Sequence, residues 1–352
     1  YSGTFNGSFK TDKEWCSDPA FILYDLLTDT RSGCALPEDA VDKFSIQKLS
    51  EYCSQLVSDG QGGTEPRFSL NVSIASTVDA QKLVKDICSV MRATPFYSEG
   101  EIKFAQDRPQ DINNLSVQEF DYVFNNANVV DGAFTYQGSS LTTRFNVINI
   151  SYFDLDNFTI DYVTVKDDNA ITRYGEKVKT IKTFGTTSRG QAQRVGKWFL
   201  YNQNRTGQVC TFATNIAAGS VLGIGDIIGI ADRVKSAIRQ GGLIKSATTQ
   251  LVTIDNSDAT NLPDSSDNPE ISCLLSDGTV QTKTIDEYLS GNVVKIVGNF
   301  SSEPVANSAY ILESGSLKSQ VFKVTGIKEN KDRTYTVSCI EHDFTKYQAL
   351  QG

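Results

Sequence analysis

The feature that most constrains this chain is the stretch 183–202, TFGTTSRGQAQRVGKWFLYN, which separates two halves with different hydrophobic periods. Ser188 stands where a helix N-cap belongs, because its hydroxyl can accept a backbone N–H of the first turn. The stretch therefore predicts one amphipathic helix over residues 188–201. Apolar or small residues recur along it at spacings of three and four: Ala192, Val195, Gly196 and Phe199.

Gly196 lies inside this apolar stripe, although glycine costs about 1 kcal/mol of helix propensity relative to alanine. We interpret it as a packing requirement that lets a sheet or a second helix come close. Gly196→Leu is therefore expected to break assembly through overpacking of about 1 to 3 kcal/mol. Arg189 and Arg194 are candidate partners for carboxylates at a subunit junction, and a solvated helix face is the alternative.

The first half of the chain has helical periodicity. Asp18 and Pro19 form a helix start, because Asp is a favoured N-cap and Pro is tolerated at the first helical position. Together the patterns predict an α+β unit over residues 15–125. Its expected elements are helices from Asp18, at 45–57 and along 80–91, a strand at 67–74, and a hairpin at 96–105 that turns at Glu99-Gly100.

From residue 129 the hydrophobic period changes to two, which is typical of half-buried strands. Asp277-Gly278 between alternating runs is a strong hairpin signal. Short strands at regular spacing predict a β-barrel or sandwich. The expected strands follow Phe134 and Tyr136, then 145–150, 162–165, 208–212, 225–230, 248–254, 271–275, 280–284, 293–297, 309–312, 321–327 and 335–340.

The fold class expected from these patterns is α+β and β-rich, with an α+β domain followed by barrel-like or sandwich-like domains. The domain boundaries follow from the changes of period. We expect an α+β domain at 1–125, strands with the central helix completing its core at 126–232, and a barrel-like domain at 233–352 that holds an inserted subdomain at 233–320.

Composition and motifs exclude several kinds of chemistry. A formal charge of −9 disfavours stable binding to nucleic acid, which requires a basic face. The single histidine, His342, cannot form a site that needs two, and it is expected to be structural. The seven cysteines contain no Cys-x-x-Cys and are expected to be free thiols. The glycine-rich loop 59–63 precedes a strand pattern rather than a helix, which disfavours a phosphate site. We therefore expect no catalytic residue, no metal and no cofactor.

Two sharper alternatives remain open at this stage. A carboxylate pair for glycoside hydrolysis could form from Asp154, Asp156, Asp161 and Asp168, because such sites are defined by separation in space. Solvated loop carboxylates are the competing interpretation. The apolar stretch 216–231 is too short and too polar for a membrane-spanning helix. A membrane-inserting loop and a buried β-strand are its two interpretations.

Several strings occur in the order found in one viral family. They are Pro19-Ala20-x-x-Leu23-x-Asp25-Leu26-Leu27, Gly62-Gly63-Thr64-Glu65-Pro66-Arg67-Phe68, Val130-x-Gly132-x-Phe134-x-Tyr136, Ile171-x-Arg173-Tyr174-Gly175, Gly185-x-x-Ser188-Arg189-Gly190-Gln191-Ala192-x-Arg194, and His342-Asp343-x-x-Lys346-Tyr347. With these strings the chain resembles the tail-tip host-specificity proteins, the central tail hubs of lambda-like long-tailed bacteriophages. The matches are weaker over residues 233–320.

The resemblance implies a non-enzymatic structural protein of the virion, located at the distal end of the tail. It implies a homotrimer about the tail axis that closes the tail tube and contacts the tape-measure protein and neighbouring tip proteins. DNA would pass through the channel, and a host receptor would bind regions outside this sequence, which is expected to be an excerpt of a longer polypeptide. The residues it suggests for the structural core or subunit contacts are Arg173, Tyr174, Ser188, Arg189, Gln191, Arg194 and Gly196. A cell-wall glycosidase and a monomeric adhesion module are the alternatives.

Overall fold

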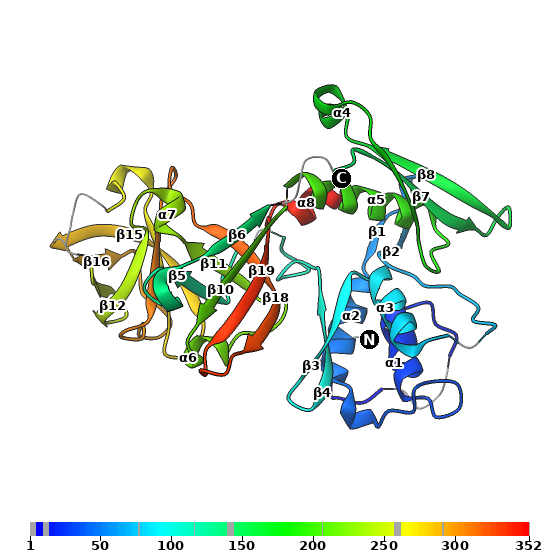
Figure 1. The fold of residues 1–352 in the computed structure, drawn as a ribbon, viewed down its shortest axis with the longest axis horizontal. Helices are drawn as coiled ribbons and strands as arrows, with labels where there is room; N and C mark the ends of the chain where they lie inside the picture. Colours follow the sequence, from blue (N-terminus) through cyan, green and yellow to red (C-terminus); the bar gives the residue numbers. More distant parts are fainter. Residues whose placement is uncertain are drawn as a thin grey trace. The chain divides into compact units, whose positions relative to one another are not determined.

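The computed structural model describes residues 5–9, 14–76, 78–115, 117–138, 144–205, 207–256, 262–290 and 292–351. Tyr1 and residues 257–261 are among the residues that lie outside these ranges. The chain divides into two compact units, each built from segments far apart in the sequence (Figure 1). Unit 1 comprises residues 1–115, 140–205 and 345–352, and unit 2 comprises 116–139 and 206–344. The boundaries expected at residues 125 and 232 stay a prediction.

Three capped helices open unit 1: α1 (Pro19–Thr28), α2 (Lys43–Cys53) and α3 (Ala80–Val90). Each follows an aspartate whose carboxylate accepts a backbone N–H of the first turn, which satisfies a donor that the helix itself cannot. These aspartates are Asp18, Asp42 and Asp79. The helices share one apolar core that includes Leu23, Ile46, Phe68 and Ile87. The predicted start at Asp18-Pro19 is confirmed.

Two expectations for this part of the chain are wrong. The second helix ends at Cys53 rather than residue 57, and β1 (Leu56–Ser58) then pairs antiparallel with β2 (Thr64–Pro66). Residues 67–74 form no strand. The N–H groups of Leu70 and Asn71 donate to carbonyls in two separate segments, so no single neighbouring strand lies beside them.

The predicted hairpin is confirmed. Strands β3 (Ala93–Ser98) and β4 (Glu101–Gln106) pair antiparallel. Glu99 and Gly100 at the turn have φ values of 57° and 90°. Positive φ at both central residues is what a tight two-residue hairpin turn requires, because its twist then matches that of the strands.

The remainder of unit 1 is a three-stranded sheet in the order β8-β7-β9 with a helix packed on it. Its strands are β7 (Val147–Asp154), β8 (Thr159–Lys166) and β9 (Val178–Lys182). Helix α4 (Asp168–Tyr174) connects β8 to β9. The central helix is confirmed as α5 (Arg189–Arg205), which lies on β7 and β8 (Figure 1). The last helix, α8 (Lys346–Gln351), returns to this unit.

Unit 2 contains a six-stranded sheet in the order β5-β11-β18-β19-β10-β6. Its neighbours are antiparallel except for β5 and β11, which run parallel. Phe124, Phe212 and Phe322 are among the buried residues that form its core. The strands are β5 (Tyr122–Asn125), β6 (Thr135–Gly138), β10 (Gln208–Thr214), β11 (Ile227–Ala231), β18 (Gln320–Glu329) and β19 (Tyr335–Glu341).

A closed barrel lies in the sequence between β11 and β18, which are themselves paired in the sheet. Its strand order is β12-β13-β16-β15-β14-β17. The predicted Asp277-Gly278 turn joins β14 to β15, with Gly278 at a φ of 86°. The β-rich α+β class with a barrel is therefore confirmed. The barrel strands are β12 (Gly241–Ala247), β13 (Leu251–Ile254), β14 (Glu270–Leu274), β15 (Val280–Ser290), β16 (Val293–Ile296) and β17 (Ala309–Glu313).

Short helical turns complete the described secondary structure. They are η1 (Glu38–Ala40), η2 (Val130–Gly132), α6 (Ile216–Gly219), α7 (Arg233–Ser236) and η5 (Ser265–Asp267).

The apolar stretch 216–231 belongs largely to the core of unit 2. All five residues of β11 are buried, because this strand lies between β5 and β18. The interpretation of this strand as a membrane-inserting loop is therefore wrong. Within the described ranges, none of the helices has the length and apolar character needed to cross a bilayer.

Asp226, just before β11, provides a pH-dependent prediction. Burial raises the pKa of its carboxyl to about 6, although the N–H of Gly223 donates to it at 2.6 Å. A carboxyl whose pKa is raised by folding destabilises the folded state once it ionises, and has no such effect where it is protonated in both states. Asp226→Asn is therefore expected to raise the melting temperature by a few degrees above about pH 7 and to leave it almost unchanged near pH 3. Calorimetry across this range tests it, and a shift of equal size at every pH would contradict it.

Candidate functional site

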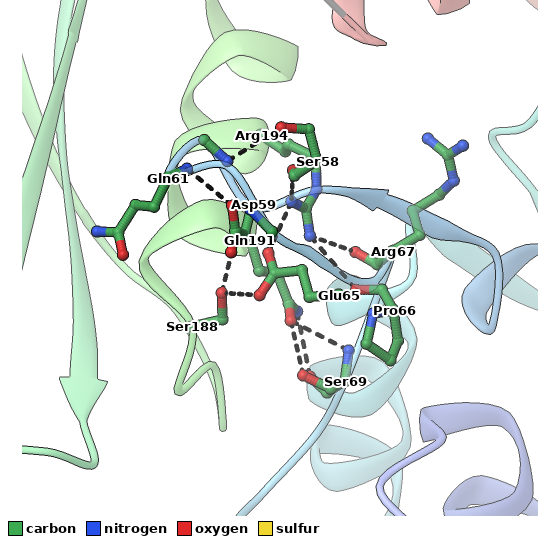
Figure 2. Close-up of polar contacts among 12 residues, drawn as sticks. Ser58, Asp59, Gln61, Glu65, Pro66, Arg67, Ser69, Ser188, Gln191 and Arg194 are labelled. Carbon is green, nitrogen blue, oxygen red and sulfur yellow. Dashed lines mark hydrogen bonds and ion pairs between the residues drawn. The ribbon is translucent and has the colours of Figure 1, made fainter.

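The candidate site is the N-terminal half of α5 together with the β1–β2 hairpin, and it lies wholly within unit 1 (Figure 2). Ser188 caps the helix as predicted, because its Oγ accepts the N–H of Gln191 at 3.2 Å. The same hydroxyl donates to the carboxylate of Glu65. A carboxylate is favoured here because the first turn of a helix carries a partial positive charge.

The glycine-rich loop between β1 and β2 folds back on itself and lies against α5. Asp59 Oδ1 accepts the N–H groups of Gln61 and Gly63 at 2.7 and 2.9 Å, and these bonds lower the pKa of Asp59. A Cβ at Gly190 would lie 2.7 Å from the carbonyl oxygen of Asp59, so the first turn of α5 and the loop approach too closely for any side chain there. The loop thus binds its own chain.

Arg194 joins the helix to this hairpin. Its Nη1 lies 2.7 Å from Glu65 Oε1 and 3.1 Å from the carbonyl oxygen of Ser58. Its Nη2 donates to the carbonyls of Pro66 and Arg67 at 3.4 and 3.0 Å. The side chains of Arg194 and Glu65 are only 11% and 20% exposed, so this ion pair is largely shielded from solvent. One guanidinium therefore holds both strands of the hairpin against α5.

Gln191 makes the neighbouring connection. It is 1% exposed, and its side-chain oxygen accepts both the N–H and the hydroxyl of Ser69 at 3.0 Å. Its amide nitrogen donates to the carbonyl of Ser69 at 3.1 Å. These bonds fix the segment that follows β2, which has no strand partner of its own. Ser188, Gln191 and Arg194 thus form one set of contacts, which we call the hairpin clamp, with Glu65 and Ser69.

Gly196 lies one turn further along α5 and faces the sheet. A Cβ at this position would lie 2.6 Å from Cγ2 of Val165 on β8 and 3.4 Å from Cγ2 of Ile148 on β7. Real Cβ atoms essentially never come as close as the first of these distances. The predicted role of Gly196 as a point of close packing is therefore what the structure shows.

A second polar cluster lies near the C-terminal half of α5. Asp107 accepts from Trp198 Nε1 at 2.6 Å and from the hydroxyl of Tyr347 at 2.9 Å, and it also pairs with Lys346. The last two residues belong to α8. Because Lys346 is only 6% exposed, this carboxylate holds the C-terminal helix to unit 1 by a buried contact.

Arg92 connects the two clusters. Its Nη2 donates to the carbonyl of Arg194 at 3.2 Å, and its guanidinium lies 5.1 and 5.0 Å from the ring centres of Phe68 and Trp198. Burial lowers the pKa of Arg92 to about 10, so the group stays charged at neutral pH. The polar groups around α5 are thus engaged in cation–π contacts and hydrogen bonds within the chain.

The remaining predicted residues lie outside the hairpin clamp. Arg189 is exposed on the first turn of α5. Arg173 and Tyr174 are exposed at the end of α4, and Tyr174 is 58% exposed. Their suggested role in subunit contacts stays a prediction. The guanidinium of Arg194, by contrast, binds Glu65 and three backbone carbonyls of its own chain.

Sequence reasoning missed Glu65, Asp59 and Asp107 as members of these clusters. Glu65 and Arg194 are separated by 129 residues, and Asp107 and Tyr347 by 240. The sequence held one signal that the hairpin packs closely against another segment. This signal is the glycine pair before Thr64, because glycines often stand where two backbones come close.

The aspartates proposed for glycoside hydrolysis are distributed over the β7–β8 hairpin and the start of α4. Asp154 and Asp156 lie at the tip of the β7–β8 hairpin, where Asp154 accepts the N–H of Asp156 at 2.9 Å and the amide of Asn157 at 2.7 Å. These bonds lower the pKa of Asp154, whereas a general acid needs a raised one. Asp161 accepts from the hydroxyl of Tyr152 at 3.1 Å, and Asp168 starts α4.

The other groups considered for chemistry are mostly buried. All seven cysteines are free thiols, and five of them are buried. His342 is 8% exposed and contacts the ring of Phe344 edge-on, with centres 5.3 Å apart. In the part of the chain that the structure describes, no three metal-binding side chains come together.

Comparison with known proteins agrees with this structural character. Residues 79–243 match the model of a family described as "Putative phage tail protein". The chain is 31% identical to Tip attachment protein J of Escherichia phage SECphi27 over 99% of its own length, and 26% identical to Tip attachment protein J of Escherichia phage SECphi4 over 96%. It spans 29% of the length of each of these relatives.

The chain is thus related to phage tail proteins. More particularly, it is homologous along nearly its whole length to part of the tip attachment proteins J of lambda-like phages, and the resemblance seen in the sequence motifs is confirmed. Among solved structures, the chain is similar to a component of the virion of a native gene transfer agent particle, with a TM-score of 0.42 and 9% identity over 82% of this chain and 44% of that one. It is also similar to a tail protein from Neisseria meningitidis MC58, with a TM-score of 0.37 and 9% identity over 82% and 62%.

Proposed function

We propose that this chain is a structural part of the central hub at the phage tail tip. It would help to close the distal end of the tail tube and connect it to receptor-binding regions that lie outside this sequence. The observation that supports this most directly is its homology to tip attachment proteins over 99% of its length. The site agrees with it, because the charged and polar side chains of the hairpin clamp hold segments of the chain together.

The partners follow from the same proposal. We expect a homotrimer about the tail axis, in contact with the tape-measure protein and the neighbouring tip and distal tail proteins. DNA would pass through the channel without stable binding. The formal charge of −9 supports that last point, because an acidic wall does not retain phosphates. In this proposal the chain has no enzymatic activity.

Immunogold electron microscopy of virions tests the location. Antibody raised against this chain should label only the distal end of the tail, with anti-capsid antibody as a positional control. Label on the capsid or along the whole tail, or intact virions that contain none of the chain by immunoblot, would contradict the proposal.

Enzymatic activity is tested separately. Replacing Asp154, Asp156, Asp161 and Asp168 together by asparagine should leave the release of peptidoglycan or capsule fragments by virions unchanged. A loss of release in this variant, with normal virion assembly, would instead support the glycosidase alternative.

A further inference from the structure

A small cavity lies beside the hairpin clamp in unit 1. Its volume is about 10 Å³, which leaves room for one group of about the size of a water molecule. Its lining includes three arginines, Arg67, Arg92 and Arg194, and every residue that lines it belongs to unit 1.

The three arginines come from segments that are far apart in the sequence. Arg67 follows β2, Arg92 follows α3, and Arg194 lies on α5. Helix α8 contributes Tyr347 and Leu350 to the lining, and these side chains are 4% and 8% exposed. The cavity therefore lies where four segments of the unit meet.

Each of these arginines has one donor that the protein leaves unused. The Nε atoms of Arg67, Arg92 and Arg194 are buried, and none of them has a hydrogen-bond partner among the described residues. Arg67 as a whole is only 7% exposed. Its Nη2 donates to Gln55 at 3.2 Å, and Nη2 of Arg92 donates to the carbonyl of Arg194 at 3.2 Å. Buried donors are nearly always satisfied by protein, water or an ion, so three of them around one cavity indicate a bound acceptor.

The charges around the cavity do not balance. Glu65 pairs with Arg194, whereas Arg67 and Arg92 form no ion pair with a carboxylate in the part of the chain that the structure describes. Asp107 also attracts Arg92, but it is already bonded to three other side chains. The aromatic rings that Arg67 and Arg92 contact carry no net charge. Two guanidinium charges thus lack a carboxylate of their own, and a buried charge is costly unless it is paired.

A water molecule does not meet both requirements. It has two lone pairs and no net charge, so it can accept from only two of the three Nε–H groups and neutralises none of the guanidinium charge. Sulfate and phosphate are too large for a cavity of about 10 Å³. A halide ion is small, carries one negative charge and accepts hydrogen bonds from every side.

We propose that this cavity binds one halide ion, chloride under physiological conditions, between the guanidiniums of Arg67, Arg92 and Arg194. The ion accepts from their Nε–H groups in charge-assisted hydrogen bonds and offsets part of their charge. Because the cavity forms only when the four segments are folded together, the ion binds the folded state alone and stabilises unit 1. This inference does not depend on the proposed hub function.

Thermal unfolding in different anions tests the site in solution. The halide-free chain is titrated with sodium bromide in place of sodium gluconate at constant ionic strength, because gluconate is too large for the cavity. Tryptophan fluorescence follows unit 1, which contains both Trp15 and Trp198. The melting temperature should rise with bromide until the site is saturated, by about 3 °C or more at a hundredfold excess over Kd.

A variant of the site and a matched control make the test specific. Arg67→Met removes one Nε–H and one charge but keeps most of the length of the side chain. It should weaken the bromide dependence of the melting temperature by at least about tenfold in bromide concentration. Arg189→Met should keep the wild-type dependence, because Arg189 is exposed on α5 and lies outside the lining of the cavity.

Crystals of the wild-type chain grown in bromide provide a measurement that needs no variant, so it decides the question even where Arg67→Met does not fold. An anomalous difference peak at the bromine absorption edge is expected in the cavity, within hydrogen-bonding distance of at least two of the three Nε atoms. Absence of this peak, or an equal response of wild type and Arg67→Met to bromide, would overturn the site. A peak in the crystal without a saturable response in solution would mean binding at crystal concentration only, and would overturn it as well.

Discussion

Replacing Arg194 with methionine is expected to destabilise unit 1 by about 3 to 5 kcal/mol. Methionine keeps most of the length of the side chain but leaves Glu65 as a shielded carboxylate without its cation. It also leaves the carbonyls of Ser58 and Arg67 without their donor. Breaking one partner of a shielded ion pair costs far more than the net stability the pair provides, because the remaining charge stays desolvated.

The measurement can be restricted to one unit. The chain has two tryptophans, Trp15 and Trp198, and both belong to unit 1. Denaturant unfolding followed by tryptophan fluorescence therefore reports the stability of this unit. Arg189→Met is the matched control, because Arg189 is exposed on the same helix, and it should change the stability by less than about 0.5 kcal/mol.

A double-mutant cycle with Glu65→Gln separates the ion pair from the carbonyl contacts. The coupling energy between the two positions should fall between about 0.5 and 3 kcal/mol. Equal stabilities for Arg194→Met and Arg189→Met would mean that the hairpin clamp does not hold β1 and β2 to α5.

Replacing Gly196 with leucine is the second change with a large expected effect. Its Cβ alone would lie 2.6 Å from Val165, and the rest of the leucine side chain has no space between α5 and the sheet. Overpacking of this kind costs about 1 to 3 kcal/mol or more. The gain in helix propensity offsets about 1 kcal/mol of it. The helix and the sheet should therefore separate, and the edges β8 and β9 should lose their fixed positions.

Two readouts test this. Tryptophan fluorescence should show lower stability of unit 1, and virions made with the variant should lack an intact tail tip by electron microscopy. Gln193→Leu introduces the same side chain on the exposed face of α5 and should have no effect on either readout. Intact virions carrying Gly196→Leu would contradict the account of the central helix.

Local structure was predictable at positions where one residue type is chemically preferred. Asp18 and Ser188 cap helices, and Glu99-Gly100 and Asp277-Gly278 turn hairpins, because these residues satisfy a backbone donor or adopt positive φ. The alternation of apolar residues predicted most strands of unit 2. The expected strand at 67–74 was wrong because the neighbours of that segment, Ser17 and Gly185, lie far away in the sequence.

The sequence by itself determined the secondary structure around the central helix, the close packing at Gly196 and the kinship with phage tail-tip proteins. The secondary structure and the packing depend on spacing and capping, which involve residues a few positions apart. The kinship depends on several motifs that occur in the same order along the chain. Only the tertiary structure decided that Arg194 binds Glu65, that Asp107 holds α8, and that β8 and β9 are the outer strands of one sheet. Such contacts join residues more than a hundred positions apart or depend on which strands lie outermost, and hydrophobic periodicity carries no information about either.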